Sequence, residues 1–174
     1  MKVLAKVEWE ASEECPKPDV SFVPAMERRR LTGVERAALA VAHQALARYA
    51  ATLPDKPAEL PQLPVVFASR WGEIGTTFKL MRQMHEEGEM SPAGFSNSVH
   101  NATPGHLSLM TKNKAPYTAI AAGADSYEMG LLEASTYPGK VLFVFAEEAT
   151  PEFYQPEFSD VQLPHAVALV IDNG

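Results

Sequence analysis

The stretch of the sequence with the most obvious chemical potential is YTAIAAGADSYEMGLLEA, residues 117–134. Its apolar start predicts a buried strand, Gly123 permits a sharp turn, and a polar segment beginning at Asp125 can cap a following helix. Enzymes with α/β folds use such an elbow to mount a nucleophile, because the helix N-terminus stabilises an anion. This elbow carries Ala124 and Ser126 but no cysteine. The scaffold of a reactive site is present without its expected reactive atom.

A serine-based alternative uses Ser126 as nucleophile, His100 as base and Asp125 as the third member of a hydrolase-like triad. The spacing of these residues does not require a triad, and no G-x-S-x-G element is present. The competing interpretation is conformational: His100 and Asn101 hydrogen-bond the backbone of the loop before a helix that opens at Thr103. The sequence leaves both interpretations open.

Other side chains that could do chemistry have equally plain structural interpretations. His106 follows Thr103 on the same predicted helix, and without a carboxylate or cysteine companion it is a poor candidate for a metal ligand. Met81, Met84 and Met90 lie at roughly helical spacing, which favours a place in the core and leaves the wall of an acyl tunnel as the alternative.

Three consecutive arginines, Arg28, Arg29 and Arg30, precede the first capped helix. Their ordinary interpretation is a solvated loop with ion pairs to nearby glutamates. The alternatives are a docking patch for an acidic carrier protein or another partner, and structural pairing with Glu35 and Glu73. Arginine suits such contacts because its planar guanidinium binds carboxylates through two hydrogen bonds.

The composition is that of an ordinary globular domain. The chain has 174 residues, of which 46% are hydrophobic and 21% charged, and this predicts one well-cored domain over residues 1–174. A net charge of −7 argues against a nucleic-acid surface, which needs clustered basic residues. No apolar run approaches the roughly 20 residues of a membrane helix, and the N-terminal segment lacks the apolar core of a signal peptide. A soluble, cytoplasmic protein is expected.

Cys15 is the only cysteine, so an internal disulfide is excluded. Its neighbours Glu13 and Glu14 disfavour the thiolate, which favours a bland surface thiol over a reactive one. No cluster of cysteine and histidine residues suggests a metal site.

Hydrophobic periodicity predicts elements in the order β, α, β, α, α, β, α, β, β. Strands are expected over residues 2–9, 64–69, 117–122, 139–146 and 165–171. Helices are expected to open at the Thr32–Glu35 capping box, at Thr76 or Thr77, at Thr103 and at about residue 126. This alternation is typical of an α/β fold with a mostly parallel sheet, and the last two strands should form an antiparallel pair at one end of it.

Two of these elements show which face they bury. In the first strand, one face carries Val3, Ala5, Val7 and Trp9. In the first helix, an amphipathic stripe is formed by Val34, Ala38, Val41, Ala45 and Tyr49.

Four segments in order carry a family resemblance. They are PDVSFVPAMERRRLTGVERAALAVAHQAL (18–46), VVFASRWGEIGTTFKLM (65–81), SPAGFSNSVHNATPGHLSL (91–109) and AIAAGADSYEMGLLEA (119–134). Together they resemble β-ketoacyl synthase-like proteins of the chain-length-factor type, which occur in aryl polyene and xanthomonadin-like pigment pathways. The resemblance implies half of a thiolase-like fold, with a five-stranded mixed, mostly parallel sheet and helices.

The resemblance also implies where the reactive residue of a condensing enzyme would stand. Counting back from Glu133 and Ala134, which resemble the Glu-Ala of the synthase pattern, places the condensing cysteine at Ala124. A methyl group cannot form a thioester. Active synthases also draw histidine or asparagine residues from a second half, and this chain covers about one half. No ketosynthase activity is expected from the chain alone.

The leading hypothesis is therefore a non-catalytic subunit that pairs with an active ketosynthase and shapes the tunnel for an acyl chain delivered by an acyl carrier protein, with no freely bound cofactor. Pairing is expected through the helices around residues 91–110 and through the apolar strand before the elbow, comprising Tyr117, Thr118, Ala119, Ile120, Ala121 and Ala122. The rival hypotheses are a hydrolase or acyltransferase using Ser126 and His100, and a homodimeric scaffold or binding protein.

Overall fold

A five-stranded mixed sheet organises the computed structural model, which describes residues 1–157 and 163–174. Across the sheet the order is β1 (Lys2–Glu10), β5 (His165–Asp172), β4 (Lys140–Glu147), β2 (Val65–Ala68) and β3 (Tyr117–Ile120). β5 is antiparallel to both of its neighbours, and the other pairings are parallel. Four of the five strands therefore run in one direction, as the predicted α/β fold requires.

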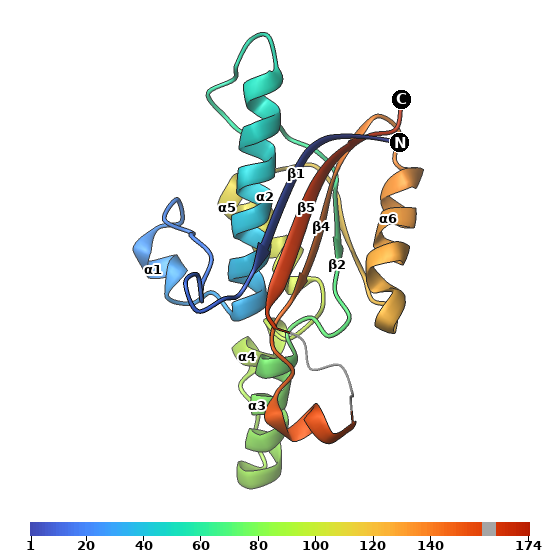
Figure 1. The fold of residues 1–174 in the computed structure, drawn as a ribbon. Coiled ribbons are helices and arrows are strands. Elements are labelled where there is room, and N and C mark those ends of the chain that lie inside the picture. The colour runs from blue at the N-terminus through green and yellow to red at the C-terminus, as the bar shows by residue number, and fades with distance from the viewer. Residues whose placement is uncertain (158–162) are drawn as a thin grey trace.

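Helices cover both faces of this sheet (Figure 1). On one face lies α2 (Gly33–Thr52), with α5 (Ala102–Thr111) packed against it. On the other face α6 (Ser126–Thr136) packs over β2 and β4. The remaining elements are shorter or project from the body: α1 (Ala25–Arg28), α3 (Ile74–Glu87), α4 (Pro92–Ser96), η1 (Gly123–Asp125) and η2 (Glu152–Glu157).

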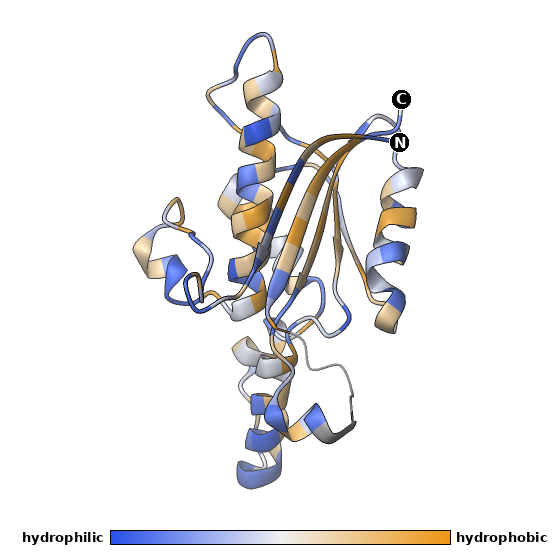
Figure 2. Cartoon of the chain, viewed as in Figure 1, coloured by the Kyte–Doolittle hydropathy of each residue, from blue (hydrophilic) through white to orange (hydrophobic). Residues whose placement is uncertain are grey.

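Each strand alternates its side chains between two separate cores. Val65 and Phe67 of β2 point towards α2, whereas Val66 and Ala68 point towards α6. Strands buried on both faces must be apolar throughout, which is why β2, β4 and β5 are continuous hydrophobic runs (Figure 2).

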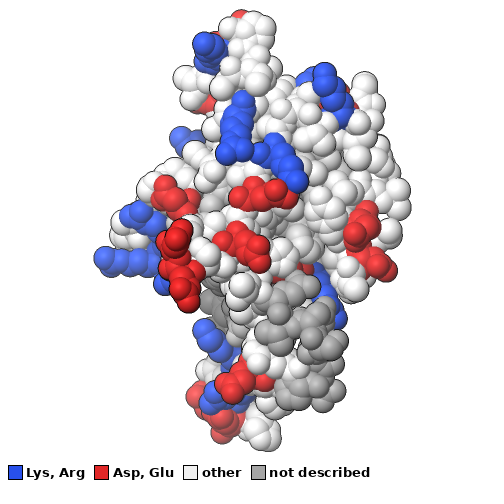
Figure 3. Space-filling model, viewed as in Figure 1, with Lys and Arg blue, Asp and Glu red and all other residues white. Residues whose placement is uncertain are grey.

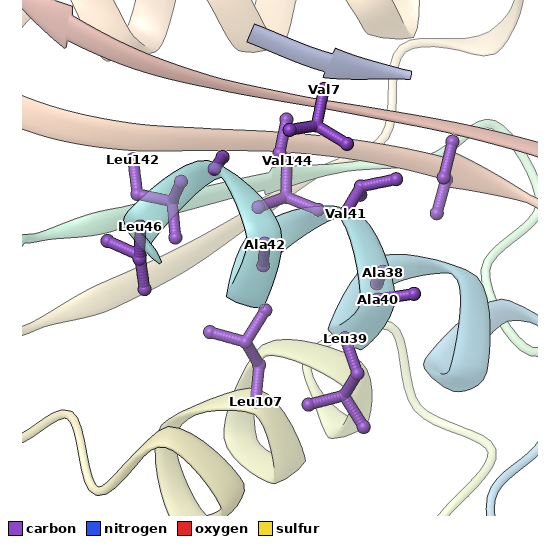
Figure 4. Packing of buried hydrophobic residues seen from close by; sticks show 14 of the residues in the cluster. Val7, Ala38, Leu39, Ala40, Val41, Ala42, Leu46, Leu107, Leu142 and Val144 are labelled. Atoms are coloured by element: carbon purple, nitrogen blue, oxygen red, sulfur yellow. The ribbon is translucent and has the colours of Figure 1, made fainter. Parts of the chain in front are cut away.

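The helix α2 is buried on more sides than its predicted stripe requires. Figure 4 shows it between the sheet, represented by Val144, and α5, represented by Leu107. Leu39 and Leu46, which lie outside the predicted stripe, are fully buried as well. The many alanines of α2 allow this close approach on two sides.

The helix starts were predicted to within about two residues. The capping box is confirmed: the Thr32 hydroxyl accepts a hydrogen bond from the Glu35 amide, and the Glu35 carboxylate accepts one from the Thr32 amide. By contrast, α3 starts at Ile74, ahead of the predicted Thr76 or Thr77, and its N-cap residue Glu73 makes no side-chain cap.

Two strand predictions were wrong in detail. The antiparallel pair β4–β5 does not lie at one end of the sheet, because β1 adds outside β5. The register of β1 also shifts between Val3 and Ala5, so Val3 is exposed and Leu4 packs towards the core instead. A bulge of this kind turns the side chains beyond it to the opposite face.

Parts of the sheet remain uncovered by helices. β3 forms one edge and ends at Ile120, two residues earlier than expected. On the outer face of β1, at the other edge, Lys6 and Glu8 form an exposed ion pair at 2.7 Å, so this region is polar. Within the described residues, no helix is long and apolar enough to span a membrane.

Candidate functional site

The predicted elbow forms between β3 and α6. Gly123 adopts φ +59°, a conformation that favours glycine, and starts the short η1 turn that leads directly into α6. Ala124 and Asp125 are exposed, and no atom lies within 4 Å of the position of a Cβ on Gly123. The position that the resemblance assigns to a condensing cysteine is therefore an open surface that presents only a methyl group.

Ser126 is not available as a nucleophile in this arrangement. Its side chain is 1% exposed. The hydroxyl donates a hydrogen bond to the Gly123 carbonyl at 2.7 Å and accepts one from the Ala122 amide at 2.9 Å. Both contacts close the elbow on itself, so the side chain stabilises the turn.

His100 lies elsewhere and does not contact Ser126 or Asp125. Its Nε2 is 2.9 Å from the Ser69 carbonyl in the loop after β2, and its ring packs where a Cβ on Gly72 would lie, 2.6 Å from Nδ1. The conformational interpretation is thus correct in kind, although the loop is a different one from that expected. Asn101 is the N-cap residue of α5, and its side chain makes no capping hydrogen bond.

Buried carboxylates gather near the ends of β2 and β4, and the sequence reasoning missed them. The side chain of Glu73 is 1% exposed and accepts hydrogen bonds from the hydroxyls of Thr32 and Thr103, both at 3.0 Å. Burial and the neighbouring charge of Glu35 raise the pKa of Glu73 to about 8. Glu73 is consequently a neutral hydrogen-bonding group over most of the physiological range.

Two further carboxylates fasten the loop between β2 and α3. Glu147 accepts hydrogen bonds from the Ser69 hydroxyl at 3.1 Å and from the backbone amides of Arg70 and Trp71. Glu148 accepts one from the Gly75 amide at 2.7 Å, in the first turn of α3. Burial raises the pKa of both carboxyls, against the opposing effect of these hydrogen bonds.

His106 does have a carboxylate companion, contrary to the sequence interpretation. Its Nδ1 is hydrogen-bonded to the carboxylate of Glu35, a residue 71 positions away in the chain. Glu35 is 2% exposed, and its other oxygen accepts the Thr32 amide at 2.9 Å. Within the described ranges no group of three or more histidine, cysteine or acidic residues could hold a metal ion.

Two cavities adjoin His106. One, of about 350 Å³, is bordered by Arg30, Glu35 and Thr76; the other, of about 410 Å³, extends to Leu109 and Tyr117. His106 and Asn97 line both cavities. None of the elbow residues lines either one.

The arginine cluster does not pair with the glutamates proposed for it. Glu35 is engaged by His106, and Glu73 by threonine hydroxyls. Across residues 1–157 and 163–174, the side chains of Arg28, Arg29 and Arg30 make no ion pair or hydrogen bond. Basic side chains stand out at the left of the molecule, over α1 (Figure 3).

The methionines and the cysteine lie at the surface. Met81, Met84 and Met90 are all exposed, so the core interpretation is wrong for them. Met81 contacts the Tyr154 hydroxyl, with a sulfur–oxygen distance of 3.9 Å. Cys15 is free and exposed, as predicted.

Comparisons with known proteins place this geometry in a family. A family model described as "Beta-ketoacyl synthase, N-terminal domain" matches residues 4–174. The fold matches a chain in the complex of the ketosynthase ApeO with its chain length factor ApeC from Xenorhabdus doucetiae, with 31% identity and a TM-score of 0.74. That match covers 87% of this chain and 62% of the other, so the chain spans less than two thirds of the length of its relative.

More distant structures share the fold. A β-ketoacyl synthase from Burkholderia phymatum matches with 16% identity and a TM-score of 0.66, covering 88% of this chain and 45% of the other. The ishigamide ketosynthase/chain length factor matches with 15% identity and a TM-score of 0.62, covering 89% and 46%. No curated protein matches the chain. The elbow, the sheet order and the family match agree, and the chain belongs to the β-ketoacyl synthase N-terminal domain family.

Proposed function

We propose that this chain is a non-catalytic subunit of the chain-length-factor type, which pairs with an active ketosynthase that extends acyl chains on an acyl carrier protein. The observation that carries the proposal is the elbow at Gly123: the strand, turn and helix are intact, but Ala124 occupies the position of the nucleophile. An alanine cannot accept an acyl group, so chemistry must come from a partner.

The free edge of β3 supports pairing. The carbonyls of Pro116 and Ile120 accept hydrogen bonds from β2. Because backbone groups alternate along a strand, those of Tyr117 and Ala119 face the open edge. An unpaired edge is a template for a strand of another chain.

Apolar side chains surround this edge. Leu109 of α5 is 68% exposed, and Phe95, Val99 and Tyr117 are exposed as well. Leu109, Val99 and Tyr117 line the same cavity, so they lie close together on the surface. Exposed apolar patches of this kind mark protein–protein contacts.

The relatives favour a ketosynthase over a second copy as the partner. The structure that matches with 31% identity is a ketosynthase in complex with its chain length factor, and another relative is named as a ketosynthase/chain length factor. Arg28, Arg29 and Arg30 supply unpaired positive charge on a chain of net charge −7, which suits an acidic carrier protein.

A hydrolase or acyltransferase reaction at Ser126 has no comparable support. The hydroxyl donates its proton to the Gly123 carbonyl, and His100 is hydrogen-bonded to Ser69. A nucleophilic serine needs a base within hydrogen-bond reach.

The test is co-expression of this chain with a ketosynthase encoded beside it, followed by size-exclusion chromatography with mass detection. We expect a one-to-one complex that is active in chain extension, with this chain alone inactive. Leu109→Glu should abolish the complex because it puts a charge in the apolar patch. Leu132→Glu is the matched control, since Leu132 is 60% exposed on α6 and lies outside the patch.

Two results would contradict the proposal. One is a stable homodimer of this chain that ignores the ketosynthase, which would favour a scaffold protein. The other is an equal loss of the complex with both leucine variants, which would remove β3 and its surroundings as the contact.

A further inference from the structure

The two cavities beside His106 form a continuous depression along α5, here called the α5 groove. The first cavity, about 350 Å³, lies against Arg30 and the start of α2. The second, about 410 Å³, continues towards β3. Because His106 and Asn97 belong to the walls of both, one elongated ligand can contact both cavities.

His106 is held in a defined orientation within this groove. An ionised carboxylate only accepts hydrogen bonds, so Nδ1 donates its proton to Glu35. Glu35 is itself fixed by the Thr32 amide at 2.9 Å. Nε2 of His106 has no partner in the described part of the chain, which leaves it free for a ligand. A buried carboxylate that orients one imidazole nitrogen commonly prepares the other for binding.

Arg30 gives this end of the groove a positive charge. Its guanidinium lines the first cavity and makes no ion pair among the described residues. The nearest acidic groups do not cancel it: Glu35 is paired with His106, and Glu73 has a pKa of about 8 and is largely neutral. The far end differs, because Val99, Leu109 and Tyr117 present apolar surface there.

We propose that the α5 groove binds a single-chain anionic amphiphile, with its phosphate or carboxylate head at Arg30 and His106 and its apolar tail along Val99 and Leu109. The assignment follows from the charge at one end and the apolar wall at the other. It concerns a site separate from the elbow and does not rest on pairing with a ketosynthase.

Isothermal titration calorimetry on the full chain alone tests the proposal. The probes are octyl phosphate and octanoate below their micelle concentrations, with octanol as the tail alone and inorganic phosphate as the head alone. We expect saturable one-to-one binding of at least one amphiphile, and weaker binding of octanol and of phosphate. The comparison between octyl phosphate and octanoate identifies which head the groove prefers.

Arg30→Gln should weaken binding about tenfold, the effect of losing one charge-assisted hydrogen bond. Arg29→Gln is the matched control, because it removes the same charge from the same cluster at a residue that does not border the groove. Leu109→Gln should weaken octyl phosphate binding and leave that of inorganic phosphate unchanged.

Equal weakening in the Arg30 and Arg29 variants would overturn the proposal, since it would reduce binding to general charge attraction. Absence of saturable binding with both amphiphiles would overturn it too, and would leave the groove as part of a protein–protein contact. His106→Gln gives an independent check, because glutamine can still donate to Glu35 while it removes the second ring nitrogen.

Discussion

Glu73 shows what one buried carboxyl does to the stability of this fold. Its pKa rises from about 4.5 in the unfolded chain to about 8 in the folded one, mainly through burial. Between these values the unfolded chain has lost the proton and the folded chain keeps it, so the folded state binds more protons. Stability therefore falls as pH rises from about 4.5 to about 8, by at most about 1.4 kcal/mol per pH unit for this group.

Glu73→Gln removes this dependence, because glutamine keeps the acceptor for Thr32 and Thr103 without a titrating proton. We expect the variant to gain stability over the wild type at pH 8 and to show little difference at pH 4.5, in urea unfolding followed by circular dichroism. Glu89→Gln is the control, since Glu89 is exposed. A Glu73→Gln profile parallel to that of the wild type would show that Glu73 does not titrate in this range.

Ser126 should act as part of the turn and not as a nucleophile. A fluorophosphonate probe is expected to leave it unlabelled, because its hydroxyl is buried and doubly hydrogen-bonded. Ser126→Ala should cost about 1–2 kcal/mol of unfolding free energy, from losing these two contacts. Labelling at Ser126 detected by mass spectrometry would revive the hydrolase hypothesis.

At this scale the sequence reveals what is local and hides what is not. The elbow and the Thr32–Glu35 capping box are spelled out within a few residues, and both were predicted. The pairing of His106 with Glu35 joins positions 71 residues apart, and no local spacing signals it. The same holds for Glu147 and its contacts with the loop after β2.

Among the elements, α6 sits closest to the sheet. A Cβ on Gly130 would lie 2.6 Å from both Ala68 and Phe143, so the helix relies on a missing side chain at this contact. Gly130→Ala should destabilise the chain by about 1–3 kcal/mol through overpacking, although alanine is the better helix former.

Gly105→Ala in α5 is the matched control, because its Cβ would meet only the Tyr117 hydroxyl, at 3.3 Å. We expect it to be neutral or stabilising in thermal unfolding. Equal destabilisation by the two variants would mean that helix flexibility, and not packing against β2 and β4, explains the need for Gly130.

Most elements could be placed from the sequence because their signals are caps, prolines and apolar periods. The short helices α1 and α4 escaped, since four or five residues are too few to show a period. The burial of α2 on two sides was also underestimated, because the helix α5 that covers its second side lies far along the chain.

For the whole molecule, the open edge of β3 predicts the effect of a single backbone change. Ala119→Pro removes an N–H that faces the edge and leaves the hydrogen bonds to β2 intact. We expect the variant to fold, as judged by circular dichroism, and to lose co-purification with the ketosynthase. Ala119→Ser keeps the N–H and should retain the complex. A complex that survives the proline would exclude strand pairing at this edge.

The sheet order was the global feature that the sequence could not supply. Strand signals along the chain state that β1 and β5 exist, but nothing local states that they are neighbours. The two strands join the ends of the described chain, with Lys2 opposite Asp172.

This neighbourhood has a consequence for how the protein is made. β5 lies between β1 and β4, so the first strand to leave the ribosome has no partner until the last strand of the chain has been synthesised. Throughout translation β1 and the side of β4 that awaits β5 both stay open. Such long-range pairing forms slowly and exposes strand edges to aggregation in the meantime. The nascent chain therefore needs protection, by a chaperone or by rapid synthesis, for nearly the whole time that it takes to make it.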